Sequence, residues 1–231
     1  MSRTLNVVRM QLINRQTFVW VPLIILGGSL VITLAIYAIL QGSGVTEPKF
    51  GGGAQAPLWY FLAVGIQALT LSFPFSQAMS VTRREFYLGT LLTAALTSAI
   101  LAVVFVLGGL LEQATGGWGM NGYFFHLDWV WQAGPAAAAL FFFVLAMLFF
   151  VTGFGCALIY RRFGSLGLTV LLVGLGALLV GALWLIAQAN AWAAVFIWFA
   201  QQGSVSLSLW MLALAALVGV LAYLGLRRAT P

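Results

Sequence analysis

Hydrophobic residues occur in six long runs that short polar connections separate. A helix needs about 20 apolar residues to cross the hydrocarbon core of a membrane. We therefore predict membrane-spanning helices at roughly 19–40, 58–79, 88–111, 135–159, 166–188 and 205–226. The predicted fold class is an all-α polytopic membrane protein with six transmembrane helices, built as a single transmembrane domain over residues 1–231.

The stretch before the first run has an amphipathic pattern. Leu5, Val8 and Leu12 share one helical face within residues 1–18, and Arg3 and Arg9 lie elsewhere. This pattern predicts an amphipathic helix on the cytoplasmic surface, with its arginines near anionic head groups. A frayed basic tail is the alternative.

The segment 189–204 is apolar but too short to cross a membrane alone. Trp192, Phe196 and Phe199 fall on one helical face within it. Aromatic side chains favour the membrane interface, so we interpret the segment as a re-entrant or interfacial helix on the outer face before the last span. An ordinary aromatic loop is the alternative.

Basic residues determine the orientation. Nine of the ten Lys and Arg residues flank the predicted spans on one side, six of them as the doublets Arg83-Arg84, Arg161-Arg162 and Arg227-Arg228. Lys49 alone falls on the other side. Because cytoplasmic loops are rich in Lys and Arg, both termini are predicted to be cytoplasmic.

Composition limits the function further. The chain is 63% hydrophobic and only 6% charged, whereas soluble domains carry about 25% charged residues. The basic residues lie at span ends rather than in a patch, which argues against a nucleic-acid partner. The predicted spans contain no Asp, Glu, Lys, Arg or His, and the chain has one His and one Cys. We therefore predict no catalytic residue, metal site or cofactor.

The second span carries a polar stripe. Gln67, Thr70 and Gln77 fall on one face of a regular helix that also contains Pro74. The stripe is a candidate substrate path. Hydrogen bonding between helices near a proline kink is the alternative.

Small residues mark close helix packing in the last two spans. Gly167, Gly174 and Gly181 recur every seven residues, and Ala215 and Gly219 form a small-xxx-small pair. Such faces suit packing within the bundle or against a second subunit, and the sequence leaves both open.

The connection after the second span differs from a plain topology signal. It combines Thr82, Arg83, Arg84 and Glu85 with the aromatic residues Phe86 and Tyr87. Arginine and aromatic side chains are the usual anchors of protein interfaces, which predicts docking to a cytoplasmic protein.

The segments AMSVTRREFYLGT and NVVRMQLINRQTFVWVPLIILGG resemble those of membrane-spanning permease subunits of type-2 ATP-binding-cassette exporters. The resemblance implies that two permeases, as identical copies or paralogues, pair over two cytoplasmic ATPase subunits in a bacterial plasma membrane. It implies that residues 82–87 couple to the ATPases, that Arg161, Arg162 and the residues to 164 form a second contact, and that 189–204 forms an outer gate.

The favoured function is an ATP-driven exporter that moves an amphipathic or lipid-like substrate along a dimer interface. The chain has no P-loop, G-x-x-x-x-G-K-[ST], so ATP hydrolysis is expected from a partner rather than from this subunit. A membrane-embedded lipid-processing enzyme and an assembly subunit without transport are the alternatives.

Overall fold

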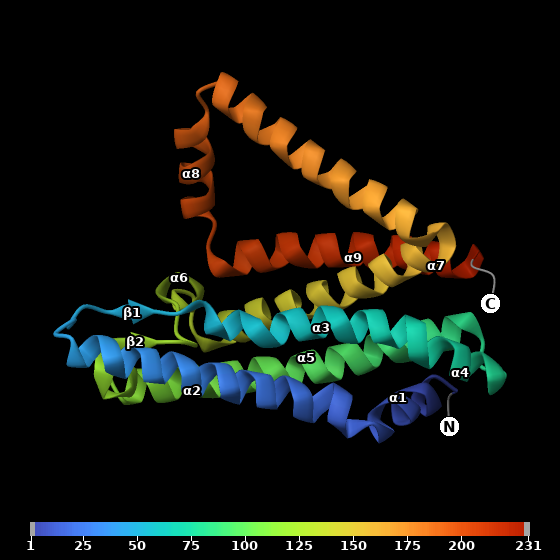
Figure 1. Ribbon diagram of the computed structural model, residues 1–231, viewed down its shortest axis with the longest axis horizontal. Coiled ribbons are helices and arrows are strands. Elements are labelled where there is room, and N and C mark those ends of the chain that lie inside the picture. The colour runs from blue at the N-terminus through green and yellow to red at the C-terminus, as the bar shows by residue number, and fades with distance from the viewer. Residues whose placement is uncertain (1–2, 229–231) are drawn as a thin grey trace.

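The protein is a bundle of long helices with almost no other secondary structure (Figure 1). The computed structural model describes residues 3–228, so residues 1–2 of the predicted surface helix lie outside the described part. Within it, five helices are long and apolar enough to cross a membrane. The predicted all-α fold with several long apolar helices is confirmed.

The chain contains nine α-helices, two short strands and four short 3₁₀ or π segments within residues 3–228. In order, these are α1 (Arg3–Ile13), η1 (Gln16–Trp20), α2 (Val21–Gly42), β1 (Lys49–Phe50), η2 (Gly52–Gln55), α3 (Ala56–Gln67), η3 (Ala68–Ser72), α4 (Phe73–Ala78), α5 (Arg83–Ala114), η4 (Gly117–Asn121), β2 (Gly122–Tyr123), α6 (Asp128–Trp131), α7 (Pro135–Gln188), α8 (Trp192–Gln201) and α9 (Ser204–Arg228).

Each apolar run of the sequence corresponds to helical structure, with one difference in connectivity. The runs 135–159 and 166–188 belong to two helices that meet at Gly164 with no loop between them, and together they form the 54-residue element α7. The only residue inside α7 with non-helical dihedral angles is Gly164, at φ 71° and ψ −171°. Glycine adopts this region without steric cost, so a single residue bends the chain. We call the segments before and after it α7a (135–163) and α7b (165–188).

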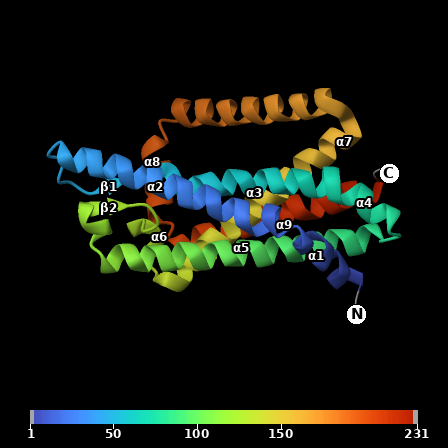
Figure 2. The same cartoon turned by 60° about the horizontal axis from the view of Figure 1, so that its bottom comes forward.

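Both ends of the described chain lie at the same end of the bundle (Figure 1). The turn between α4 and α5 and the bend of α7 also lie there, so all three arginine doublets gather at this end. The strands, α6 and α8 lie at the opposite end (Figure 2). We call these the basic end and the strand end.

The core lies where α7a crosses α3 and α5. Two glycines allow α3 and α7a to touch backbone to backbone: a Cβ at Gly153 would lie 2.0 Å from the Leu62 carbonyl oxygen, and one at Gly65 would lie 2.1 Å from that of Phe150. Aromatic rings fill the space beside this crossing. Phe105 packs against Phe142 with ring centroids 4.5 Å apart.

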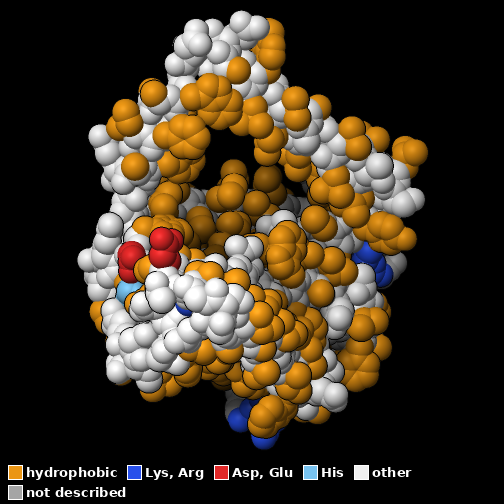
Figure 3. Space-filling model, turned by 60° about the vertical axis from the view of Figure 1, so that its left-hand side comes forward, with side chains coloured by type: hydrophobic (Ala, Val, Ile, Leu, Met, Phe, Trp, Pro, Cys, Tyr) orange, Lys and Arg blue, Asp and Glu red, His pale blue; other side chains and the backbone are white. Residues whose placement is uncertain are grey.

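The C-terminal third of the molecule leaves this core. α7b, α8 and the first half of α9 frame an open triangle, which we call the helical frame (Figure 1). The space-filling view shows the opening lined by hydrophobic side chains (Figure 3). Residues 169–180 are exposed throughout.

The two small-residue faces therefore have different surroundings. A Cβ at Gly174 or Gly181 would meet nothing within 4 Å among residues 3–228, so this part of α7b has no close neighbour there. A Cβ at Gly219 would lie 3.1 Å from the Tyr87 hydroxyl, and Ala215 is buried. The α9 face packs within the bundle, and the α7b face does not.

Helix α1 packs against α5 rather than lying only on a surface. Val7 and Gln11 are buried, and the Gln11 side-chain amide donates to the Thr90 hydroxyl at 2.8 Å. Of the predicted apolar face, Val8 is buried against the bundle and Leu5 is 43% exposed, so only part of that face packs within the chain. Gly89 of α5 leaves room for this contact, because a Cβ there would lie 2.6 Å from the Cβ of Val7.

Candidate functional site

The connection between α4 and α5 is a tightly held turn at the basic end. The Thr82 hydroxyl accepts from the Glu85 backbone amide, and the Glu85 carboxylate accepts from the Thr82 amide at 3.0 Å and from its hydroxyl at 2.7 Å. This reciprocal capping box fixes the start of α5. Glu85, a member of the predicted coupling set, therefore has a structural role at the helix cap.

Arg83 ties this turn to the end of the last helix. Its guanidinium donates to the carbonyl oxygens of Arg227 at 2.9 Å and Leu226 at 3.4 Å. The last carbonyls of a helix have no intrahelical partner, and a cation near them also interacts favourably with the helix dipole. The start of α5 and the end of α9 are thus one connected unit.

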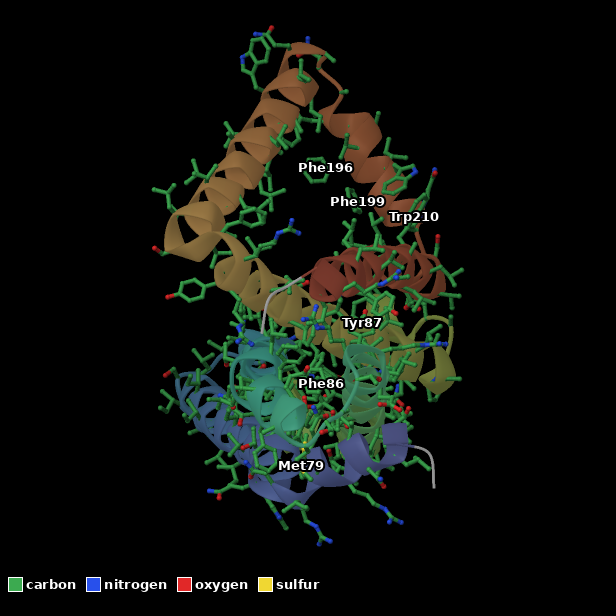
Figure 4. The ribbon with its side chains drawn as sticks, turned by 90° about the vertical axis from the view of Figure 1, so that its right-hand side faces the viewer. Met79, Phe86, Tyr87, Phe196, Phe199 and Trp210 are labelled. Carbon is green, nitrogen blue, oxygen red and sulfur yellow. The ribbon has the colours of Figure 1, made fainter. Side chains whose placement is uncertain are left out.

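Phe86 and Tyr87 are core residues and not exposed docking anchors. Phe86 is fully buried and contacts Phe73 edge to face at 5.1 Å, and Tyr87 is 7% exposed. The Tyr87 hydroxyl donates to the Gly219 carbonyl oxygen at 2.6 Å. Figure 4 shows Phe86 within the bundle and Tyr87 beside α9. The sequence pattern identified the aromatic pair but not which way the two side chains point. Both residues belong to the first turns of α5, which begins at Arg83, and they lie on the buried side of that helix.

The exposed part of the connection is Met79, Ser80, Thr82 and Arg84. Ser80 has a left-handed backbone conformation, at φ 57°. These residues, and not the aromatic pair, form the exposed surface of the connection.

The second predicted contact, at Arg161 and Arg162, also has one side chain bonded within the bundle and one that is not. Arg161 donates to the Leu69 carbonyl oxygen at 3.4 Å and lies over the Phe73 ring, 5.5 Å from its centroid. Arg162 points elsewhere and lies over its neighbour Phe163.

The carbonyl that Arg161 binds is left free by a proline. In the π-turn η3, the Phe73 amide donates to Ala68, five residues earlier. The next amide in this register would donate to Leu69, but it belongs to Pro74, which has no N–H. Arg161 supplies the missing donor. A π-turn is followed by one residue and then a proline in α2 as well, where η1 precedes Val21 and Pro22.

The predicted polar stripe is divided by this π-turn. A π-turn adds one residue to the helix and so rotates the residues after it by roughly 100° relative to a regular helix. Gln67 lines a cavity of about 320 Å³ beside α1. Thr70 is exposed and bonds its own helix at Ile66, and Gln77 donates to the Val81 carbonyl. The three side chains do not form one continuous stripe.

The aromatic stripe of the predicted outer gate lies on α8, which is a ten-residue helix between α7b and α9. Trp192 and Phe196 stack at 6.1 Å, and Phe196 and Phe199 are more than half exposed. Figure 4 shows Phe196 and Phe199 on the side of α8 that faces the opening of the helical frame.

Glu112 has a structural role that the sequence analysis did not predict. It is fully buried at the strand end and accepts four hydrogen bonds of 2.7–2.8 Å, from the Trp118 indole and three backbone amides. The amides belong to Phe124, Phe125 and His126. The carboxylate therefore holds the loop after α5 in place. One feature of the sequence could have identified Glu112: it is a lone acidic residue where a predicted span meets a loop rich in glycine and aromatic residues.

The loops after α2 and α5 are joined beside Glu112. β1 and β2 pair in parallel, with Lys49 opposite Gly122 and Phe50 opposite Tyr123. The Lys49 ammonium is buried and donates to the Met120 carbonyl oxygen at 2.9 Å. His126 lies 3.5 Å from Asp128, but no group of three His, Cys, Asp or Glu placed for a metal ion occurs among residues 3–228. This end is a packed cap.

The five apolar helices define the class of the protein, which is a multi-pass membrane protein. Comparisons of the chain with models of protein families, with curated proteins and with solved structures find no match. The function is therefore inferred from the residues and their arrangement.

Proposed function

We propose that this chain is the transmembrane permease subunit of an ATP-driven exporter in a bacterial plasma membrane. It moves an amphipathic or lipid-like substrate along the interface between two permease copies, while separate cytoplasmic subunits hydrolyse ATP. The apolar helices and the resemblance of the α4–α5 connection to exporter permeases support this proposal.

In the proposed topology the chain crosses the membrane six times with both termini in the cytoplasm. α7a and α7b count as separate crossings because a 54-residue helix would measure about 80 Å, far more than a bilayer of about 30 Å. The common location of both chain ends and of the arginine doublets supports a cytoplasmic basic end.

The observation that carries the coupling proposal is the link from Arg83 to the end of α9. A partner that pushes on the exposed turn at Met79, Thr82 and Arg84 moves the start of α5. Because Arg83 and Tyr87 bond α9, at Arg227 and Gly219, the same push reaches the last helix. Phe86 and Tyr87 thus act in coupling from inside the bundle.

A second permease copy is the proposed neighbour of the helical frame. Around Gly174 and Gly181 of α7b nothing lies within 4 Å among the described residues, although small residues on one helical face usually mark close helix contacts. Phe196 and Phe199 would then face the substrate route between the copies.

The coupling proposal is tested by co-purification with a cytoplasmic ATPase partner and by ATPase-driven transport. We expect the double variant Met79→Glu, Arg84→Glu to lose ATPase binding without loss of thermal stability, because both side chains are exposed. Asp128→Arg, a charge reversal at the strand end, is the control. Unchanged coupling in the Met79, Arg84 variant would exclude this turn as the contact.

The dimer proposal is tested by disulfide cross-linking in membranes, with Cys156→Ser as background. Gly174→Cys and Gly181→Cys should form disulfides between copies. Gly176→Cys, on the opposite side of α7b, should not. Equal cross-linking of all three would indicate random collision, and none at Gly174 or Gly181 would remove α7b from the interface.

A further inference from the structure

A cavity of about 560 Å³ opens between three helices at the basic end. Its walls are Leu88 and Leu91 of α5, Met147 of α7a, and Ala216 and Val220 of α9. Clefts of 300–1,000 Å³ between bundle helices are typical ligand sites. The residues lining it on α9 run from Leu212 to Tyr223, which corresponds to about 16 Å along the helix.

The cavity exists because α9 carries small residues along this face. Ala215, Ala216 and Gly219 carry little or no side chain, and the Tyr87 ring occupies only the space beside Gly219. The small-xxx-small pair of α9 therefore makes room for a narrow groove rather than for a direct contact between helix backbones.

A single charged side chain marks one end of the groove. Arg84 lines it at the start of α5 and is exposed. No partner for its guanidinium occurs among the described residues 3–228, whereas the neighbouring charged groups have contacts. Arg83 donates to the end of α9, Arg227 lies over the Tyr223 ring of its own helix, and Glu85 is held in the capping box.

We propose that this groove binds one acyl chain of an anionic phospholipid, with the phosphate at Arg84. The wall is apolar along its length and cationic at one end, which complements an amphiphile with an acidic head. An arginine near a membrane surface favours anionic lipids by about 1 kcal/mol, or roughly fivefold in affinity. The site does not require transport. Only its assignment to the cytoplasmic leaflet rests on the proposed topology.

The test uses the purified full chain in an uncharged detergent, without ATPase. The probes are an anionic and a zwitterionic phospholipid that carry the same photoreactive acyl chains. Mass spectrometry of the labelled peptides should place the anionic probe on residues 88–91, 147–151 and 212–220, about fivefold above the zwitterionic probe. Labelling spread evenly over all exposed helix faces would mean annular lipid only and would overturn the proposal.

Matched variants test the groove and the charge separately. Ala216→Trp fills the groove and should abolish labelling of the three segments, whereas Ala213→Trp, on an exposed part of α9 outside it, should not. Leu88→Trp, with Leu92→Trp as control, repeats the test from α5 if Ala216→Trp fails to fold.

Arg84→Gln should remove the fivefold preference, and Arg162→Gln should keep it. Loss of labelling on addition of free glycerol phosphate would show a site for the soluble head group and refute acyl-chain binding. Labelling that survives both groove-filling variants would also refute it.

Discussion

The backbone contact between α3 and α7a predicts a large effect for a single methyl group. In Gly153→Ala, the new Cβ would lie 2.0 Å from the Leu62 carbonyl oxygen, whereas ordinary contacts begin near 3.4 Å. The oxygen belongs to helix backbone and cannot rotate away as a side chain would. The two helices must therefore separate by more than 1 Å.

The expected net cost follows from two opposing terms. Overpacking a tight core costs about 1–3 kcal/mol, and replacing glycine by alanine within a helix returns about 0.5–1 kcal/mol. We expect Gly153→Ala to lower the free energy of unfolding by about 1–2 kcal/mol. Gly65→Ala should do the same, because its Cβ would lie 2.1 Å from the Phe150 carbonyl oxygen.

Unfolding in mixed detergent micelles, followed by tryptophan fluorescence at protein dilutions that keep the chain monomeric, measures this difference. Gly174→Ala is the matched control, because nothing lies within 4 Å of its Cβ and only the helix-propensity gain remains. A Gly153→Ala protein as stable as the parent, or a Gly174→Ala protein as destabilised as Gly153→Ala, would refute the packing argument.

Two further predictions concern polar groups. Glu112→Gln should lower the free energy of unfolding by about 2–4 kcal/mol, because the amide nitrogen cannot accept from the backbone N–H groups that the carboxylate satisfies. Thermal unfolding measures this loss. The control Glu47→Gln, at an exposed position, should have no effect. Arg161→Ala should cost about 1–2 kcal/mol by leaving the Leu69 carbonyl unpaired. Adding Pro74→Ala should restore most of that loss, since the new amide can donate to Leu69; additive losses in the double variant would contradict the assignment.

The apolar runs predicted where helices form, because a membrane-spanning helix satisfies its backbone internally and needs only length and hydrophobicity. The limits of α5 and α9 differ from the predicted runs by a few residues at most. The Arg161-Arg162 doublet predicted a loop, but Gly164 makes the bend within one residue. A glycine among polar residues does not reveal its dihedral angles in the sequence.

The contacts between helices were not predictable in the same way. Gly153 and Gly65 matter because α3 and α7a are neighbours, and nothing in either segment identifies the other. The regular spacing of Gly174 and Gly181 is a clearer pattern, yet nothing lies within 4 Å of a Cβ at either glycine in the described part of the chain. In the sequence Glu112 looks like an ordinary loop charge, because its four donors come from residues 118–126, whose conformation only the folded loop defines.

The two arginines of an internal doublet make different contacts, although a signal for membrane orientation requires only their charge. In each internal doublet the first arginine donates to a carbonyl of another segment, Arg83 to α9 and Arg161 to the proline-interrupted turn η3. Neighbouring residues on a helix point about 100° apart, so the second arginine, Arg84 or Arg162, faces outward. An orientation signal needs two charges at the basic end. The first arginine of each pair also satisfies a backbone carbonyl of another segment, which leaves the second for a lipid or a partner protein.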